Sequence, residues 1–176
     1  ELDTGLSAWN LAMGSQELYD WLDAEPQLFH PGDLDYIHSV ERISKLSNVI
    51  SINGGVQLDL MGQENAESTG TRQLSGVGGQ MDFLEGAYRS KGGKGFICIN
   101  SSRVTKDGER KSNILATIPG GSTISAPRTM IQYVATEYGI ASLSGKTLRE
   151  RAEAMASIAH PDFREELMKY AQENFK

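Results

Sequence analysis

The sequence has little cysteine and no long hydrophobic run, and both absences narrow the class of protein. Its single cysteine, Cys98, excludes a disulfide within the chain and makes a reducing compartment, the cytoplasm, the expected location. No apolar run approaches the roughly 20 residues of a membrane-spanning helix, so no membrane partner is expected. The three histidines and the cysteine are scattered without a metal-ligand spacing, so no metal site is predicted.

Positive charge is also in short supply. The chain has 17 Lys and Arg against 23 Asp and Glu, and this balance excludes the basic footprint of a nucleic-acid-binding protein. Its 39% apolar and 23% charged residues are ordinary for a globular protein. A length of 176 residues without a linker or repeat predicts a single domain over residues 1–176. The chain begins at Glu1 rather than Met, which indicates a piece of a longer protein.

Short hydrophobic patterns predict a mixture of strands and helices. Strands are predicted at residues 48–53, 56–60, 95–100, 113–118 and 131–136. Helical spacing predicts helices at residues 15–24 and 80–89, whereas residues 25–47, which contain prolines and a glycine, are expected to be irregular. Asn53-Gly54-Gly55 predicts a turn between the first two strands. Strands with interspersed helices indicate an α/β domain.

Two helices are predicted at the C-terminal end. Thr147-Leu148-Arg149-Glu150 is a capping box, in which the Thr hydroxyl and the Glu carboxylate each accept a hydrogen bond from a free backbone N–H. His160-Pro161 ends this helix, and we expect His160 to cap or pack around the break. Phe163, Leu167 and Tyr170 then mark the apolar face of the second helix.

A glycine-rich loop before residues 80–89 is the strongest candidate for a binding element. Gly76, Gly78 and Gly79 let the backbone approach a ligand and direct free N–H groups at an anion or a developing oxyanion. The spacing is not a dinucleotide fingerprint, because Met81 stands where the third glycine belongs. A tight turn that only precedes the helix is an equally open interpretation.

Two further segments place charged residues beside glycines or at a strand end. Lys91-Gly92-Gly93-Lys94-Gly95 lacks the Ser or Thr that follows the lysine of a P-loop, so a helix-ending turn is favoured. Glu137 follows the strand predicted at residues 131–136, at the strand end where α/β sheets gather functional groups. A solvated carboxylate is the alternative for Glu137.

Ordered motifs across nearly the whole chain resemble those of one family. They are IN at 52–53, VQLDLMGQ at 56–63, NAES at 65–68, QLSGVGGQMDF at 73–83, VATEYGIA at 134–141, GKTLRERA at 145–152 and IAHPDFR at 158–164. The chain resembles the C-terminal domain of the acetyl-CoA hydrolase/transferase family, particularly its butyrate:acetate and 4-hydroxybutyrate CoA-transferases. The resemblance implies a NagB/RpiA/CoA-transferase-like open α/β sheet with flanking helices, the C-terminal half of a two-domain enzyme.

The resemblance also implies a reaction. In the family, a glutamate of the preceding half, which by this register lies upstream of residue 1, attacks an acyl-CoA thioester to give an acyl-glutamyl anhydride and CoA thiolate. The thiolate then forms a glutamyl-CoA thioester, from which a second carboxylate collects the CoA. Coenzyme A is therefore expected as a substrate, with no permanently bound cofactor. This segment alone is expected to be inactive.

The resemblance assigns roles to individual residues. The glycine matching Gly79 supplies an oxyanion-hole N–H, and the carboxylate matching Glu137 lies beside the reacting centre, so these two are the catalytic candidates. The residues expected to bind substrate are Asn53, Gly76, Gly78, Gln80 and Lys106. Lys106 lies in a run that departs from the family's Ser-Thr-Ala-Lys-Gly pattern, and it either meets a CoA phosphate or is simply solvated.

Three functions stay open at this point. The leading one is transfer of CoA between an acyl-CoA and a short-chain carboxylate. An acyl-CoA hydrolase would keep the fold and differ in the access of water to the covalent intermediate. A non-catalytic CoA-binding or assembly module is the third. The expected partners are the two substrates, the N-terminal half of the same polypeptide and further copies in a homo-oligomer.

Overall fold

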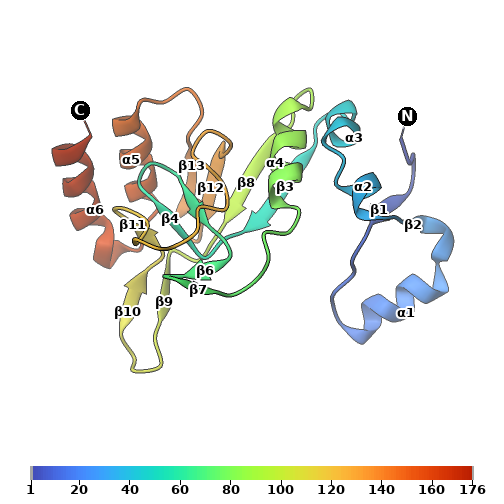
Figure 1. Cartoon of the computed structure of the whole chain (residues 1–176), viewed down its shortest axis with the longest axis horizontal. Helices are drawn as coiled ribbons and strands as arrows, with labels where there is room; N and C mark the ends of the chain where they lie inside the picture. Colours follow the sequence, from blue (N-terminus) through green and yellow to red (C-terminus); the bar gives the residue numbers. More distant parts are fainter. Residues whose placement is uncertain (1, 176) are drawn as a thin grey trace.

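The computed structural model describes residues 2–175, and a four-stranded sheet lies at its centre (Figure 1). β3 (Ile50–Gly54), β8 (Lys94–Cys98) and β12 (Tyr133–Thr136) are parallel, and β13 (Gly139–Ser142) runs antiparallel to β12. The strand order is β13-β12-β8-β3. These elements confirm the strands predicted at residues 48–53, 95–100 and 131–136, with ends shifted by a few residues.

A second, smaller sheet has the order β11-β4-β5. β4 (Gln57–Asp59) pairs in parallel with β11 (Ile114–Leu115) and antiparallel with β5 (Glu64–Asn65). The strands predicted at residues 56–60 and 113–118 are therefore present but shorter, because each finds only two or three partner residues. The turn predicted at Asn53-Gly54-Gly55 was wrong in its position: Asn53 and Gly54 belong to β3, which pairs with β8 rather than with β4, and the chain leaves the first sheet for the second after Gly54.

Two hairpins add four further strands. β6 (Ser68–Thr69) pairs with β7 (Arg72–Gln73), and β9 (Ser102–Val104) pairs with β10 (Arg110–Ser112). No sequence pattern predicted them, because strands of two or three mostly polar residues carry no periodicity.

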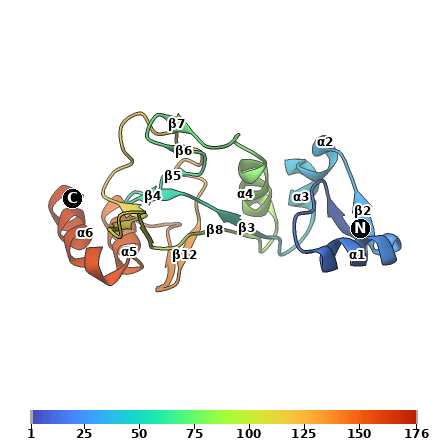
Figure 2. The same cartoon turned by 90° about the horizontal axis from the view of Figure 1, so that it is seen from below.

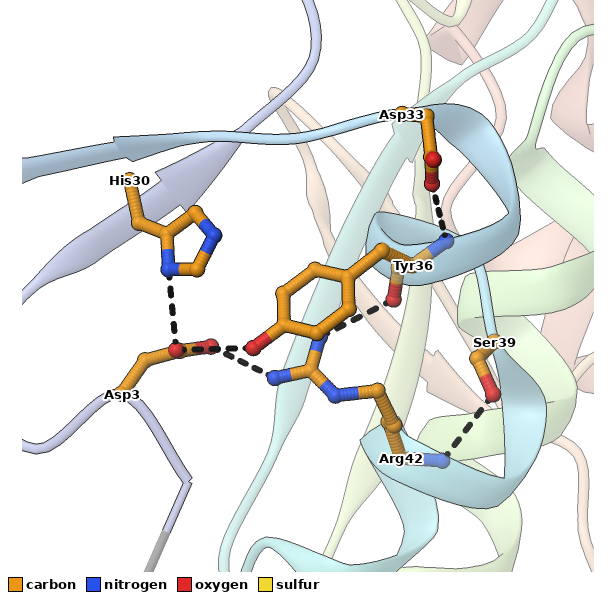
Figure 3. A network of polar contacts seen from close by, with 6 residues as sticks. All are labelled: Asp3, His30, Asp33, Tyr36, Ser39 and Arg42. Carbon is orange, nitrogen blue, oxygen red and sulfur yellow. Dashed lines mark hydrogen bonds and ion pairs between the residues drawn. The ribbon is translucent and has the colours of Figure 1, made fainter.

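Residues 25–47, expected to be irregular, instead contain short regular elements. These are η1 (Pro26–Leu28), β2 (Phe29–Pro31), α2 (Leu34–Ile37) and α3 (Val40–Lys45). Side-chain caps start both α-helices: Asp33 accepts a hydrogen bond from the Tyr36 N–H at 2.8 Å, and Ser39 from the Arg42 N–H at 3.3 Å (Figure 3). The expectation was wrong because these caps outweigh the prolines and the glycine around them.

One carboxylate fastens the N-terminal segment to α2 and α3 (Figure 3). Asp3 accepts hydrogen bonds from the Arg42 guanidinium at 2.6 Å and the Tyr36 hydroxyl at 2.9 Å, and it lies 3.1 Å from the His30 ring. The hydrogen bond from Arg42 lowers the pKa of Asp3, so the carboxylate stays charged. β1 (Ser7–Trp9), α1 (Gln16–Ala24), β2, α2 and α3 consequently form one group at an end of the molecule (Figures 1 and 2).

This N-terminal group meets the central sheet through α3 and α4 (Gln80–Arg89). A Cβ at Gly86 of α4 would lie closer than 3.0 Å to Ile43 of α3, so glycine allows the two helices to approach. α4 confirms the helix predicted at residues 80–89. Gly92, with φ +77°, then turns the chain into β8, which confirms the helix-ending turn predicted at residues 91–95.

The two C-terminal helices are α5 (Leu148–Ser157) and α6 (Pro161–Asn174). Both hydrogen bonds of the predicted capping box between Thr147 and Glu150 are present. His160 caps α6 by accepting a hydrogen bond from the Asp162 N–H at 3.2 Å, as predicted. Within residues 2–175, no helix has both the length and the apolar character needed to cross a membrane.

A buried guanidinium connects α5 to three loops. Arg151, 8% exposed, donates hydrogen bonds to the backbone carbonyls of Met61 at 2.8 Å, Leu143 at 2.7 Å and Arg128 at 2.8 Å. The three acceptors belong to separate segments. Met61 lies between β4 and β5, Leu143 directly follows β13, and Arg128 precedes β12. Arg151 therefore fixes these three segments to α5.

We expect Arg151→Lys to lower the free energy of unfolding by about 3 kcal/mol. Lysine cannot reach three separate carbonyls, and each buried acceptor left unpaired costs about 1–3 kcal/mol. Arg149→Lys is the matched control: Arg149 is exposed, pairs with Glu153 at 3.0 Å and should change stability by less than about 0.5 kcal/mol. Urea unfolding measures both, and equal effects of the two substitutions would contradict the role given to Arg151.

Candidate active site

Polar residues follow the ends of three parallel strands at one edge of the central sheet. Asn53 lies at the end of β3, Ser101 comes shortly after β8, and Glu137 directly follows β12. The strands are in register, since Asn53 pairs with Ile97, which in turn pairs with Val134. The carboxyl edge of such a sheet is where α/β proteins bind ligands.

Ser101 holds Glu137 in one orientation. One carboxylate oxygen accepts a hydrogen bond from the Ser101 N–H at 2.9 Å, and the other accepts one from its hydroxyl at 2.6 Å. Desolvation raises the pKa of Glu137, but the hydrogen bonds outweigh it and the pKa is lowered. The site edge therefore presents an oriented carboxylate that is charged at neutral pH.

The glycine loop leads into α4 at this same edge, because a helix that connects two parallel strands starts where the first strand ends. Gly78 has φ +62°, a left-handed conformation that favours glycine, and a Cβ at Gly76 or Gly78 would meet open space. Gly79 is the N-cap of α4 and has no side chain to cap the first turn. The helix N–H groups are therefore left for an anion.

Gln80 connects the start of α4 to a buried carboxyl group. Its side-chain amide donates a hydrogen bond to Glu64, which is 0% exposed. The other oxygen of Glu64 would lie closer than 3.0 Å to a Cβ at Gly55, directly after β3. Burial raises the pKa of Glu64 to about 8, so this group holds a proton at neutral pH.

His38 is a neighbour of the glycine loop that no sequence pattern indicates. A Cβ at Gly79 would lie closer than 3.0 Å to its ring. Its Nδ1 is 3.5 Å from the Asp82 carboxylate, and its Nε2 is 3.2 Å from the Asn10 amide nitrogen. A cleft of about 480 Å³ is lined by His38, Asp82, Gly78, Gly79, Leu34 and Ser39, among others.

Lys106 lies apart from the other candidates. It is exposed, in the turn between β9 and β10 where the Gly108 N–H donates to the Thr105 carbonyl at 3.0 Å. Figure 1 shows this hairpin projecting away from the loop that leads into α4. The structure thus brings Asn53, Glu137 and the glycine loop to one edge and leaves Lys106 outside it.

Together these features define an α/β domain whose site combines an uncapped helix N-terminus with an oriented carboxylate, an arrangement suited to a reaction that develops an oxyanion. Within residues 2–175, no three His, Cys, Asp or Glu side chains gather as a metal ion would require. The profile of the acetyl-CoA hydrolase/transferase C-terminal domain matches residues 14–171. The chain belongs to this family, as its motifs predicted.

The curated relatives include CoA-transferases. The chain is 43% identical to butyryl-CoA:acetate CoA-transferase of Anaerostipes caccae and covers 38% of that protein with 97% of its own length. It is 45% identical to 4-hydroxybutyrate coenzyme A transferase of Clostridium kluyveri, covering 37% of it with 93% of its own length. Acetyl-CoA hydrolase of Kluyveromyces lactis is more distant, at 30% identity over 89% of this chain and 29% of that protein. The chain therefore spans well under half of these relatives.

Two solved structures share the architecture. RipA from Yersinia pestis superposes with a TM-score of 0.85 at 39% identity, over 98% of this chain and 38% of RipA. 4-Hydroxybutyrate CoA-transferase from Porphyromonas gingivalis gives a TM-score of 0.78 at 38% identity, over 99% of this chain and 39% of that one. These similarities confirm the mixed α/β fold of the chain.

Gly79→Ala should lower the free energy of unfolding by about 1–3 kcal/mol, because the new methyl group meets the His38 ring. In a His38→Ala background the same substitution should cost much less, since the obstructing ring is gone. A double-mutant cycle by urea unfolding gives the coupling free energy between the substitutions at Gly79 and His38. Equal costs in both backgrounds would show that His38 does not limit the space at Gly79.

Glu64→Gln should make stability less sensitive to pH. Folded Glu64 keeps its proton up to about pH 8, whereas the unfolded chain releases it near the ordinary pKa of a glutamate, 4.5, so wild type loses stability as pH rises between these values. The loss approaches about 1.4 kcal/mol per pH unit, and the variant, equal to wild type below about pH 5, should not show it. Glu165→Gln, an exposed change on α6, controls for the lost charge in the same urea titrations. Parallel pH profiles of wild type and Glu64→Gln would refute the assignment.

Proposed function

We propose that this chain is the C-terminal domain of a CoA-transferase that moves CoA between an acyl-CoA and a short-chain carboxylate. The observation that carries this is the oriented, charged Glu137 at the same sheet edge as the uncapped start of α4, in a chain 43–45% identical to named CoA-transferases. Residues 1–176 would form one domain of the NagB/RpiA/CoA-transferase type. A cytoplasmic location and a homo-oligomeric state belong to the same proposal.

In the proposed reaction, a glutamate in the N-terminal part of the longer enzyme attacks the thioester carbonyl. The carbonyl oxygen gains a negative charge, which the Gly79 N–H and the positive end of α4 would stabilise. CoA then leaves as a thiolate, and the glutamate is left as a neutral anhydride. Attack by CoA thiolate on the glutamyl carbonyl releases the acid and forms the glutamyl-CoA thioester.

The charge of Glu137 gives it a distinct role beside the nucleophile. A second carboxylate raises the energy of the ionised glutamate before attack, and this repulsion is relieved when the glutamate becomes an anhydride. Ser101 keeps the Glu137 carboxylate charged and prevents it from turning away. Glu137 is therefore proposed to orient and activate the nucleophile rather than to transfer a proton.

The proposed substrate contacts come from the backbone more than from charged side chains. Gly76 and Gly78 leave open space beside the loop, and Asn53 and Gln80 offer amide groups at the same edge. Lys106 contributes only if a CoA phosphate extends to the β9–β10 hairpin. An acyl-CoA hydrolase and a non-catalytic CoA-binding or assembly module are the alternatives, and the response to an added acceptor separates them from a transferase.

Glu137→Gln should lower kcat for transfer of CoA from butyryl-CoA to acetate by about 100-fold or more. The enzyme for this test joins the chain to the preceding part of the Anaerostipes caccae relative. Gln keeps the shape of the side chain but removes the charge, so the affinity for CoA, measured by calorimetry, should change little. Glu166→Gln, an exposed change on α6, is the matched control and should leave kcat unaltered.

The outcomes of this assay distinguish a CoA-transferase from an acyl-CoA hydrolase and from a non-catalytic module. Unchanged kcat in Glu137→Gln would remove Glu137 from the site. CoA release by the joined enzyme without any carboxylate acceptor would favour a hydrolase, and CoA binding without turnover would favour a module. The chain alone, which lacks the proposed nucleophile, should transfer no CoA.

A further inference from the structure

The central sheet has two apolar faces, and helices of this chain cover one of them. On the covered face, Ile97 and Val134 are 0% exposed. α4 packs here against Gly95, and the end of α5 reaches the same face, where the Thr136 hydroxyl donates to the Ile158 carbonyl at 2.7 Å. Side chains alternate along a strand, so the residues between these point the other way.

The opposite side, here called the open face, consists of Ile52, Phe96, Cys98, Tyr133, Ala135 and Ile140. The strand register places Ile52, Phe96 and Tyr133 in one row across β3, β8 and β12. Cys98, Ala135 and Ile140 form the next row. The Phe96 and Tyr133 rings stack with centroids 4.8 Å apart, which makes the first row continuous from β8 to β12.

Within residues 2–175, Ile52, Cys98 and Ile140 of this surface are exposed to solvent, and Phe96, Tyr133 and Ala135 are half-buried. Ile52 is 70% exposed, Ile140 is 64% exposed, and Cys98 is exposed as well. Figure 2 shows α4 on one side of β3 and β8, with no helix of this chain on their other side. Sheets of parallel strands are normally buried on both faces, and an apolar face of this kind marks an interaction surface.

The relatives indicate the occupant. The matched profile is a C-terminal domain, and the Anaerostipes caccae and Clostridium kluyveri transferases each have more than half of their length outside the match. The open face also adjoins the site, since Cys98 ends β8 shortly before Ser101, and Ala135 lies two residues before Glu137. A polypeptide that covers the open face thereby lies next to Glu137. That is where the proposed nucleophile has to arrive.

We propose that the open face is the docking surface for the N-terminal part of the longer enzyme, which lays an apolar layer over β3, β8 and β12. This inference rests on the proposed function, because it names the surface that joins the two parts of the active site. Lys94, at the start of β8, is the one charged side chain that the strand register places on this face among β3, β8 and β12, and the rest of the face is apolar or small. A mainly apolar face fits a permanent partner from the same polypeptide better than a transient one. A second copy of this chain is the competing occupant.

Cys98 reports on this surface directly, because it is the only cysteine of the chain and lies in the open face. The rate of maleimide labelling at Cys98, read by peptide mass spectrometry, is compared between the chain alone and the joined enzyme. We expect labelling to be at least about tenfold slower in the joined enzyme, since the thiol then reacts only during local opening. Equal rates in a joined enzyme that melts cooperatively would overturn the proposal.

Charge substitutions test the same surface without the thiol. Ile52→Glu should leave the melting temperature of the chain alone nearly unchanged and lower that of the joined enzyme by several degrees. Val104→Glu, a change at a 57% exposed aliphatic residue on β9, is the matched control and should alter neither. If Ile52→Glu unfolds the chain alone, the face is already covered within the chain and the proposal is wrong.

The remaining outcomes separate this inference from the function on which it rests. Labelling of the chain alone that slows as its concentration rises would assign the face to a second copy and overturn the proposal. A joined enzyme with a protected Cys98 but no CoA transfer would support the docking surface and reject the proposed function. CoA transfer with an unprotected Cys98 would support the proposed function and reject the docking surface.

Discussion

The candidate site depends on the parallel alignment of β3, β8 and β12. Because these strands run in one direction, the residues that follow them emerge at one edge, and Ser101 can donate both of its hydrogen bonds to Glu137. Parallel strands also require a crossover, and α4 provides it between β3 and β8. A crossover helix begins at the carboxyl edge, so the connection that makes the sheet parallel also delivers the glycine loop to the carboxylate.

Buried polar groups connect separate segments of the chain around the small sheet. Leu58 and Ile114 give the small sheet its apolar core, and beside it Glu64 bonds Gln80 while Arg151 bonds backbone carbonyls of three separate segments. A buried polar group without hydrogen-bond partners destabilises the folded state. With its partners in place it favours one arrangement of the surrounding backbone, because other arrangements leave it unpaired. Gln80 is positioned in this way, so the geometry of the glycine loop depends on a carboxyl group that the proposed reaction does not consume.

Local signals in the sequence were sufficient for part of this structure. The limits of α4, the capping box at Thr147 and the cap at His160 follow from residues within one or two turns of each other, and all three were predicted. Residues 25–47 were misjudged because their caps compete with prolines and a glycine over the same few positions. The contacts of His38 with Gly79, Ser101 with Glu137 and Glu64 with Gln80 cross between elements, so they depend on a topology that a single sequence does not reveal.

The two faces of the central sheet have different roles: the covered face stabilises the domain, and the open face is the proposed docking surface. Its covered face buries Ile97 and Val134 completely, so this side of the sheet forms a core from the chain's own helices. The open face adds little to that core, because a side chain that stays 64–70% exposed removes little apolar surface from water. Apolar residues there are nevertheless costly in solubility, and an uncovered parallel sheet invites association. Their presence is therefore better explained by a partner that removes them from water, and the nearness of Cys98 and Ala135 to Ser101 and Glu137 places that partner beside the carboxylate.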